Sequence, residues 1–494
     1  MKLRFPVLAP ACVLVVFATP ASAEDQPKPP PPRDSGMEAR MARIRANRGT
    51  WTADSAAARA RATSYDVAAK HEALRAAAAK VDQAIVGFFP ILSGVGRYAH
   101  LSALPTTGTP TLLTAPAGPV ADPTQPLPPG TPLRAIPLAF PVVLDTWTFQ
   151  GTLTVPLSDY VFRLSQAHTS ATRNEEAARQ DKLAAEAKAQ ADARLAYYQW
   201  VKADGQKEVV EQSLVAAKEH LRDAQNLFKV GQASKADVLA VESQVASGEL
   251  TVEQSNELLE VALDQLRTLT HARDDEQIAI GEDLSTALPK QGYDLAALKQ
   301  EAFAHRPEIL ALAAAEESLQ KSATATRAAQ LPRLDAFGDV IYANPNTRIF
   351  PQEAKFHATW DVGLQVTWTA NDAFKAGGAG AEIDANAARV RAQRAQVRDA
   401  VSAEVTAAVL SSRTADASLS SSDTALASAE EAYRVRRELY KVGKASNVEL
   451  SDAEATVFRA RLVAVNSRID QRIARFRVDH AVGRDVAVAP RRAE

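Results

Sequence analysis

The chain contains the same turn twice. Residues 226–239 read NLFKVGQASKADVL and residues 438–450 read ELYKVGKASNVEL, so Gly231 pairs with Gly443 and Ser234 with Ser446 at one constant offset. A repeat of this kind indicates two copies of one structural unit in series. Any fold proposed for the 494 residues must therefore place equivalent elements in both halves.

Each half shows the same order of predicted elements. A helical stretch ends at a proline, Pro90 or Pro332, and two strand-like segments follow. A very long stretch rich in Ala, Glu, Gln and Arg then leads to the glycine turn and a second long helix. The first long helix is predicted from about Ser158 to Leu227, which at about 1.5 Å per residue reaches on the order of 100 Å. That length exceeds what a compact globular domain needs.

Small and branched apolar residues recur after each turn at alternating steps of three and four, the pattern of a coiled-coil seam. The first copy of the seam comprises Val238, Val241, Val245, Gly248, Val252, Ser255, Leu259, Ala262, Leu266 and Leu269. The second comprises Leu450, Ala453, Val457, Ala460, Ala464 and Ser467. Because most of these side chains are small, helix backbones can approach closely. The heptads alone are equally typical of an ordinary antiparallel coiled-coil scaffold.

Four segments alternate apolar and polar residues, as strands do. They are TWDVGLQVTW (359–368), TWTFQGTLTV (146–155), the segment after Pro332 with Leu334, Ala336, Val340 and Tyr342 on one face, and ILSGVGRYAH from Ile91, where the alternation is weakest. Tryptophans near strand ends and about ten residues per strand are typical of an outer-membrane barrel. A half-buried sheet packed on a helix is the soluble alternative. Four strands cannot close a barrel, since about eight is the smallest known, so a barrel would require several copies of the chain.

The two strand pairs differ in their connections. Residues 104–141 form a long segment whose prolines exclude helix and the interior of a sheet. The matching connection, ANPNTRIFPQEAKFH, is much shorter. Because both connections begin and end at predicted strands, we interpret them as loops on the outer, extracellular side. A plain disordered linker is the other interpretation of the first one.

The N-terminus has the features of a secretory signal peptide. Lys2 and Arg4 precede an apolar run, and Ala21-Ser22-Ala23 is a small-residue cleavage site, so the mature chain is predicted to start at Glu24. Cys12 lies inside this segment without a convincing lipobox, which predicts a mature chain without disulfides or a lipid anchor. After the signal, no apolar run approaches the roughly 18 residues of a membrane-spanning helix.

Charge and motifs exclude several functional classes. The net charge of −2 and the scattered positive residues argue against nucleic acid as the main partner. The eight histidines have no metal-ligand spacing, and neither Gly94-x-Gly96 nor the glycines at 377–380 occur in a phosphate-binding motif. We therefore expect no enzymatic activity, no cofactor and no metal site.

The mature chain resembles the TolC-type outer-membrane efflux proteins, the outer membrane factor family. The residues that carry the resemblance are the FKVGQAS and YKVGKAS turns, HRPEI (305–309) leading into a helix that ends LPRL, the WDVGLQVTW strand and AYYQWVKA (196–203). The resemblance spans roughly residues 60–483, and the order of the elements is more specific than any single motif.

The resemblance implies a mainly α fold with a transmembrane β-barrel contribution. Each chain would supply a long antiparallel coiled coil and four strands in two structural repeats, and a homotrimer would form a twelve-stranded barrel above a twelve-helix tunnel. The chain would then divide into a signal peptide (1–23), an N-terminal periplasmic segment with a Pro-rich linker (24–60), a first repeat (61–271), an equatorial segment (272–300), a second repeat (301–483) and a C-terminal tail (484–494).

The repeated turn has a structural explanation of its own. A glycine permits the positive φ that ends a helix in a tight reversal. Ser234 with Asp237, and Ser446 with Glu449, then match a capping box at the start of each returning helix. The resemblance further implies that the turns are the tips of the tunnel and contact a periplasmic adaptor through Lys229, Gly231, Ser234, Lys441, Gly443 and Ser446.

The resemblance also implies a gate at these tips. Glu449 and Asp452, six and nine residues after Gly443, occupy positions where family members can carry rings of carboxylates, and Asp237 and Tyr440 complete the candidate gate. Six like charges brought together in a trimer would raise some pKa values and attract cations. Ala445 stands where relatives can carry an arginine of the closed-state latch, so Lys444 or Lys441 is the expected substitute. Trp147, Phe149, Tyr342, Trp360 and Trp368 are the expected lipid-facing aromatic residues of the strands.

The function implied is that of a passive exit duct in the outer membrane of a Gram-negative bacterium, with a large periplasmic portion. It would serve a tripartite efflux or type I secretion system, with energy supplied by an inner-membrane pump through the adaptor. The alternative is a soluble periplasmic coiled-coil adaptor or envelope scaffold protein. An adaptor would carry one hairpin flanked by small β domains, whereas this chain has two predicted hairpins.

Overall fold

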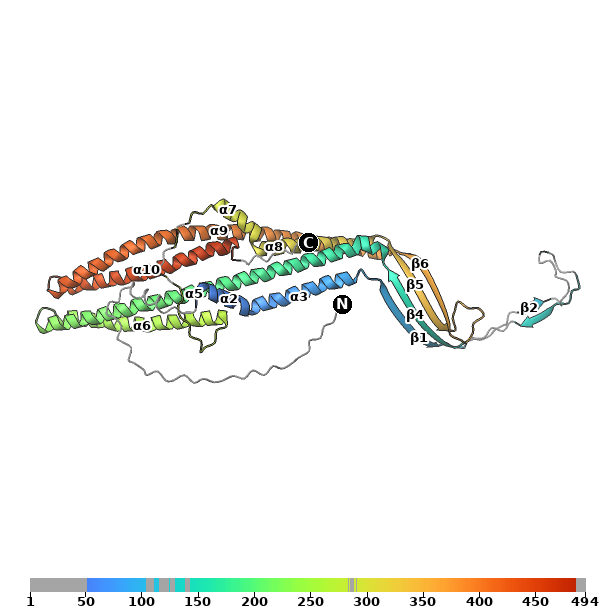
Figure 1. Ribbon diagram of the computed structural model, residues 1–494, viewed down its shortest axis with the longest axis horizontal. Coiled ribbons are helices and arrows are strands. Elements are labelled where there is room, and N and C mark those ends of the chain that lie inside the picture. Colours follow the sequence, from blue (N-terminus) through green and yellow to red (C-terminus); the bar gives the residue numbers. More distant parts are fainter. Residues whose placement is uncertain are drawn as a thin grey trace, which may run out of the picture.

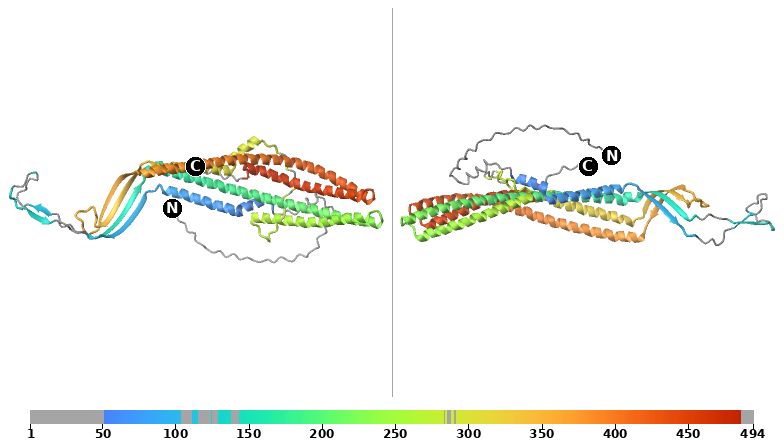
Figure 2. Two further views of the ribbon diagram at one scale, coloured as in Figure 1. Left: turned by 180° about the vertical axis from the view of Figure 1, so that it is seen from behind. Right: turned by 90° about the horizontal axis from the view of Figure 1, so that it is seen from below.

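A computed structural model describes residues 51–103, 111–114, 124, 129–137, 143–282, 284, 288–289 and 291–485. The predicted signal peptide, most of the segment 24–60, parts of the loop 104–141 and most of the tail 484–494 lie outside these residues. The molecule is elongated, with the turns of two helical hairpins at one end and the strands beyond the opposite end of the helices (Figure 1). Views from behind and from below show the same order (Figure 2).

The two halves of the chain repeat one order of elements, as predicted. The first half contains α3 (Tyr65–Val86), β1 (Ile91–His100), β4 (Asp145–Val155), α5 (Ser165–Lys229) and α6 (Lys235–Thr270). The second contains α8 (Pro307–Arg327), β5 (Arg333–Asn344), β6 (His357–Thr367), α9 (Ala370–Lys441) and α10 (Asn447–Val482). The expected start of the first long helix near Ser158 falls in α4 (Leu157–Asp159), which continues through a π-helical turn, Tyr160–Leu164, into α5.

The two hairpins, α5 with α6 and α9 with α10, lie side by side (Figure 1). Val241 and Leu266 of the first seam are fully buried, and Ala464 is fully buried in the second. The two hairpins also approach each other closely at a glycine: a Cβ on Gly205 of α5 would lie 2.8 Å from Val465 Cγ1 of α10. The coiled-coil seam predicted from the small residues is therefore confirmed. Every helix in the described part of the chain lacks the apolar run that would be needed to span a lipid bilayer.

The four predicted strands form one antiparallel sheet in the order β1-β4-β5-β6. β1, where the alternation is weakest, pairs with β4 along its whole length, from Ile91 opposite Thr154 to His100 opposite Asp145. On β6 the apolar side chains are exposed, with 73% of Val362 and 68% of Leu364 accessible. The sheet thus has an uncovered apolar face, and β1 and β6 are its two edge strands.

The described part of the Pro-rich connection has an element that was not predicted. It contains a two-stranded antiparallel ribbon, β2 (Thr111–Thr114) with β3 (Arg134–Pro137). The prolines did not exclude this because both strands of a two-stranded ribbon are edges, and Pro137 stands at the end of its strand.

The main apolar core lies midway along the helices. Trp51 precedes α2 (Ala53–Thr63), forms a parallel bridge with Ile280 and accepts a hydrogen bond at its carbonyl from Tyr197 Oη at 3.1 Å. Tyr197 and Leu266 pack in the same cluster with no exposed surface. The segment before the first repeat and the segment after α6 therefore close over the same part of the helices.

A second core joins the start of the second repeat to the end of the chain. α7 (Leu295–His305) packs against α9 and α10. At the HRPEI motif Pro307 begins α8, and the buried Arg306 donates through Nη1 to the carbonyls of His480 and Ala481 at 3.3 and 3.4 Å. Both carbonyls lie in the last turn of α10, where the following helical amides are missing, and that of His480 also accepts from the Gly483 amide at 2.9 Å.

Candidate functional site

The two turns at the helical tips have the same backbone geometry. Gly231 has φ +74° and Gly443 φ +70°. In each turn the residue after the glycine donates its amide to a carbonyl five residues back, Gln232 to Leu227 and Lys444 to Leu439, both at 2.9 Å. This is the 6→1 bond of a Schellman ending, which requires the left-handed conformation that glycine adopts without strain.

Each returning helix begins with a complete capping box. The carboxylate of Asp237 accepts from the Ser234 amide at 2.9 Å, and that of Glu449 accepts from the Ser446 amide at 2.9 Å. In return each serine Oγ accepts from the amide of its acidic partner, at 3.1 and 3.3 Å. Hydrogen bonds from the Ser234 side chain and backbone lower the pKa of Asp237, and those from the Ser446 backbone and side chain lower the pKa of Glu449. The capping role inferred from the spacing is therefore present at both tips.

The predicted gate carboxylates have different surroundings. Besides the cap, Glu449 forms an ion pair with Arg436 of α9 at 3.2 Å, and about half of each side chain is exposed. Asp452 is exposed one turn further along α10. Within one chain the hydrogen bonds from Ser446, and to a smaller extent Arg436, lower the pKa of Glu449, opposite to the rise expected for a ring of like charges. The Arg436 partner was missed because it lies on the other helix of the hairpin, where the register was unknown.

Tyr440 is buried rather than presented at the entrance. Only 4% of its surface is accessible, and its ring meets the His220 ring edge-on with centroids 5.1 Å apart. Its hydroxyl has no hydrogen-bond partner among the described residues. Burial raises the pKa of Tyr440, and the Asp237 carboxylate adds to that rise. The structure thus places Asp237 near Tyr440 without a hydrogen bond between them.

The remaining tip residues are exposed. Lys229, Gly231, Ser234, Lys441, Gly443 and Ser446 all lie on the accessible surface of the turns. Lys441 forms an ion pair with Glu438 of its own helix at 3.0 Å. The sequence analysis missed an apolar feature here: 68% of Val230 and 66% of Val442 are exposed, one beside each turn glycine.

The predicted lipid-facing aromatic residues are exposed on or beside the sheet. Trp147, Phe149, Tyr342 and Trp360 lie within strands and expose 42, 48, 47 and 72% of their surface. Trp368 lies one residue beyond β6, and its Nε1 donates to the carbonyl of Gln330 at 3.1 Å. It is therefore a residue of the strand-to-helix junction rather than of the strand.

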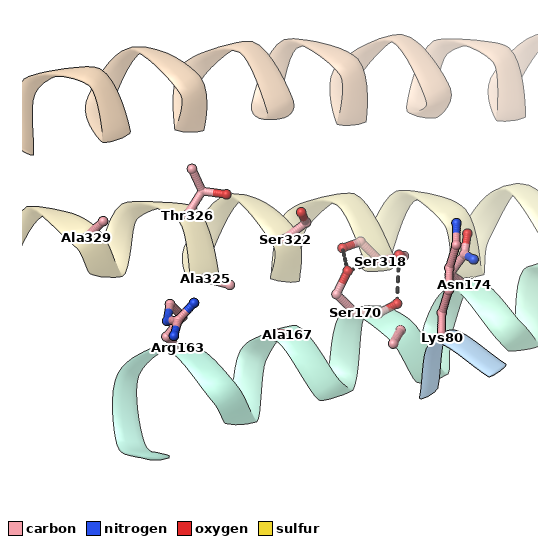
Figure 3. A pocket seen from close by; sticks show the side chains of 11 residues that line it. Lys80, Arg163, Ala167, Ser170, Asn174, Ser318, Ser322, Ala325, Thr326 and Ala329 are labelled. Atoms are coloured by element: carbon pink, nitrogen blue, oxygen red, sulfur yellow. Dashed lines mark hydrogen bonds between the residues drawn. The ribbon is translucent and has the colours of Figure 1, made fainter. Parts of the chain in front are cut away.

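A separate cavity of about 530 Å³ lies between α3, α5 and α8, near the ends of these helices that join the strands. Ser170 of α5 and Ser318 of α8 are in contact in its wall, each hydroxyl donating to the other residue's carbonyl at 2.8 Å (Figure 3). Its charged lining residues are Lys80 and Arg163, and none of the described lining residues is an acid, a histidine or a cysteine. The cavity offers no nucleophile with an adjacent base. Within the described ranges, no three His, Cys, Asp or Glu side chains are grouped to hold a metal ion.

Comparisons with solved structures show that the fold of the chain is shared. The chain is similar in structure to the outer-membrane channel OprN, with a TM-score of 0.67, 17% identity and coverage of 87% of this chain and 89% of OprN. The chain is likewise similar to the CmeC outer membrane channel of Campylobacter jejuni, with a TM-score of 0.66, 15% identity and coverage of 87% of this chain and 85% of CmeC. It is also similar to the open state of the MtrE outer membrane channel of Neisseria gonorrhoeae, with a TM-score of 0.66, 15% identity and coverage of 87% of this chain and 88% of MtrE.

No curated protein sequence matches the chain significantly. The family model for outer membrane efflux proteins matches residues 56–271 and 298–484, which is most of the chain and includes both hairpins and all four long strands. The chain therefore belongs to the outer membrane efflux protein family, whose members are channels of the Gram-negative outer membrane and not enzymes.

Proposed function

We propose that three copies of the chain form one channel, with a twelve-stranded barrel in the outer membrane above a twelve-helix periplasmic tunnel. The observation that carries this proposal is the open sheet with its two edge strands, β1 and β6. A backbone group left unpaired in hydrocarbon costs several kcal/mol. Pairing β1 of one copy with β6 of the next removes both edges. The exposed apolar face, with Trp147, Phe149, Tyr342 and Trp360 and with Trp368 at its border, then contacts lipid.

The channel acts as the passive exit duct of a tripartite efflux or type I secretion system. An inner-membrane pump supplies the energy through a periplasmic adaptor. The tips lie at the end of the molecule opposite the strands, so a barrel in the outer membrane directs them toward the cell interior (Figure 1). Their exposed residues, including Lys229 and Lys441, form the adaptor contact.

The proposed channel also implies a division of the chain into two repeats and a belt around the helices. Residues 61–271 and 301–483 are the two repeats, and residues 272–300 belong to an equatorial belt. The bridge between Trp51 and Ile280 supports a belt that also includes the N-terminal segment. The alternative of a soluble adaptor or scaffold is wrong, because the chain belongs to a family of outer-membrane channels.

The gate of the channel consists of Asp237, Tyr440, Glu449 and Asp452. Three copies bring six carboxylates of Glu449 and Asp452 to the narrow end of the tunnel, where they attract cations. Arg436 offsets part of this charge through its ion pair with Glu449. The gate opens when the tips of the hairpins move apart, a shift in population favoured by adaptor contacts available only in the open state.

Single-channel recording in planar lipid bilayers tests the gate. The double variant Glu449→Ala, Asp452→Ala should raise the conductance or reduce its sensitivity to cations. Because Glu449 also caps α10, Asp452→Asn is the informative single variant: Asp452 makes no capping bond, so its effect reports charge alone. If the double variant and Asp452→Asn both match the wild type in conductance and cation sensitivity, these residues do not form the gate.

A further inference from the structure

The polar face of the sheet carries two carboxylates directly opposite each other. Asp339 of β5 pairs with Asp361 of β6 in the strand register, so both side chains project from the same face. This face is opposite to the apolar one, since the strand neighbours of Asp361 are Trp360 and Val362, which expose 72% and 73% of their surface on the apolar side. Like charges directly opposite each other destabilise a sheet, so the pair is retained at a cost.

The two carboxylates have different partners. Asp339 accepts hydrogen bonds from Thr152 Oγ1 and, at 3.0 Å, from Gln150 Nε2, both on the neighbouring strand β4. These donors are neutral, so they leave the charge of Asp339 in place. Asp361 instead forms an ion pair with Arg348 Nη2 at 2.6 Å. The cluster of Arg348, Asp339 and Asp361 therefore carries one positive and two negative charges.

Arg348 belongs to the connection between β5 and β6 and not to a strand. Its side chain reaches back over the polar face, where Nη1 donates to the carbonyl of Trp360 at 3.1 Å. Its backbone is fixed by Asn346, whose side-chain oxygen accepts from the Arg348 amide at 3.0 Å. Asn346 in turn donates to the carbonyl of His357 at 3.0 Å and to Thr359 Oγ1 at 3.1 Å, and only 2% of its surface is exposed. The guanidinium is thus held in place while 41% of the Arg348 side chain stays accessible.

We propose that Arg348 is a charge-selectivity residue of the barrel lumen. In the proposed trimer the apolar face contacts lipid, so the polar face lines the lumen and three copies of the cluster surround the path of exported molecules. Asp339 and Asp361 attract cations there, whereas each Arg348 guanidinium offsets one of these charges and attracts anions. This inference rests on the proposed function and deepens it, because it places a determinant of substrate charge in the barrel, at the end of the channel opposite to the gate.

The permeability ratio of K⁺ to Cl⁻ tests the role of Arg348. It is obtained from the reversal potential of the reconstituted full-length channel in a KCl gradient. Three guanidiniums about 10 Å from the barrel axis, screened by roughly 0.1 M salt, change this ratio about fivefold. Arg348→Gln should therefore raise the ratio about fivefold, and Asp339→Asn should lower it by a similar factor. The double variant Arg348→Gln, Asp361→Asn keeps the net charge of the cluster, so its ratio should stay within about twofold of the wild type.

The matched control is Lys355→Gln. Lys355 lies in the same connection and carries the same charge, but 75% of its side chain is exposed and its ion pair, with Glu353 at 3.7 Å, stays within the connection. This variant should leave the ratio unchanged. Heat-resistant oligomers show that the variants assemble. If Arg348→Gln alone does not assemble, the difference between Asp361→Asn and the double variant gives the contribution of Arg348.

The outcomes separate this inference from the proposed function. The effect of Arg348→Gln should persist when Glu449 and Asp452 are both alanine, because the gate lies at the other end of the molecule. A conducting channel whose ratio does not respond to the loss of Arg348, or responds equally to Lys355→Gln, overturns the selectivity role alone. A wild type that forms no channel overturns the proposed function.

Discussion

Replacement of the turn glycine Gly443 by alanine should loosen one tip without a steric clash. A Cβ at this position would lie 3.8 Å from Gln232 Oε1, an ordinary contact, so the cost arises from the backbone. An L-residue in the left-handed conformation costs roughly 1–2 kcal/mol. Alanine returns about 0.4–1 kcal/mol by restricting the unfolded chain. The net cost is about 1 kcal/mol, which predicts roughly fivefold more frequent local opening of the tip.

Hydrogen–deuterium exchange followed by mass spectrometry measures this opening directly. Peptides that cover residues 438–450 should exchange about fivefold faster in Gly443→Ala, while peptides over residues 226–239 in the other tip serve as an internal reference. Gly443→Asn is the matched variant, because asparagine enters the left-handed conformation more readily than alanine does. Exchange in Gly443→Ala within twofold of the wild type, or an equal effect of both substitutions, would refute the assignment of the cost to backbone conformation.

Two further predictions concern the tips and the sheet. The pKa values of Glu449 and Asp237 are lowered from their ordinary values of 4.5 and 3.8. At a pH above these ordinary values the two caps stabilise the tips fully. This stabilisation is lost as the pH falls through the lowered pKa values. Exchange at the tips, corrected for its intrinsic pH dependence, should therefore accelerate below about pH 4, and a flat profile would contradict the capping role. Val362→Arg on the apolar face of β6 should cost about 2–4 kcal/mol in the bilayer and reduce oligomers in outer-membrane fractions. Gln365→Arg on the polar face should leave them intact, so an equal loss in both variants would argue against lipid contact at Val362.

The elements that could be predicted from the sequence are those set by local patterns. Alternation at period two located all four long strands, and the glycine followed by Ser-x-x-acid located both turns with their caps. These signals depend on residues within a few positions of each other. The alternation located even β1, where it is weakest. In the structure β1 is stabilised by pairing with β4 along its whole length.

Contacts between distant segments could not be predicted in the same way. The pair Glu449 and Arg436 depends on how α9 and α10 align, and the pair His220 and Glu454 depends on how the two halves of the chain align. No local pattern encodes either alignment. The ribbon in the Pro-rich connection was missed for a different reason. Prolines exclude the interior of a sheet, but a two-stranded ribbon has no interior strand.

The two edge strands have a genetic consequence under the trimeric arrangement proposed above. A subunit with a damaged β6 still offers an intact β1 to its neighbour, so it can join an assembly that it cannot complete. In a cell that produces damaged and normal subunits together, most rings would contain at least one faulty seam. Mutations at this edge should therefore behave as dominant, whereas mutations that prevent the whole chain from folding should be recessive.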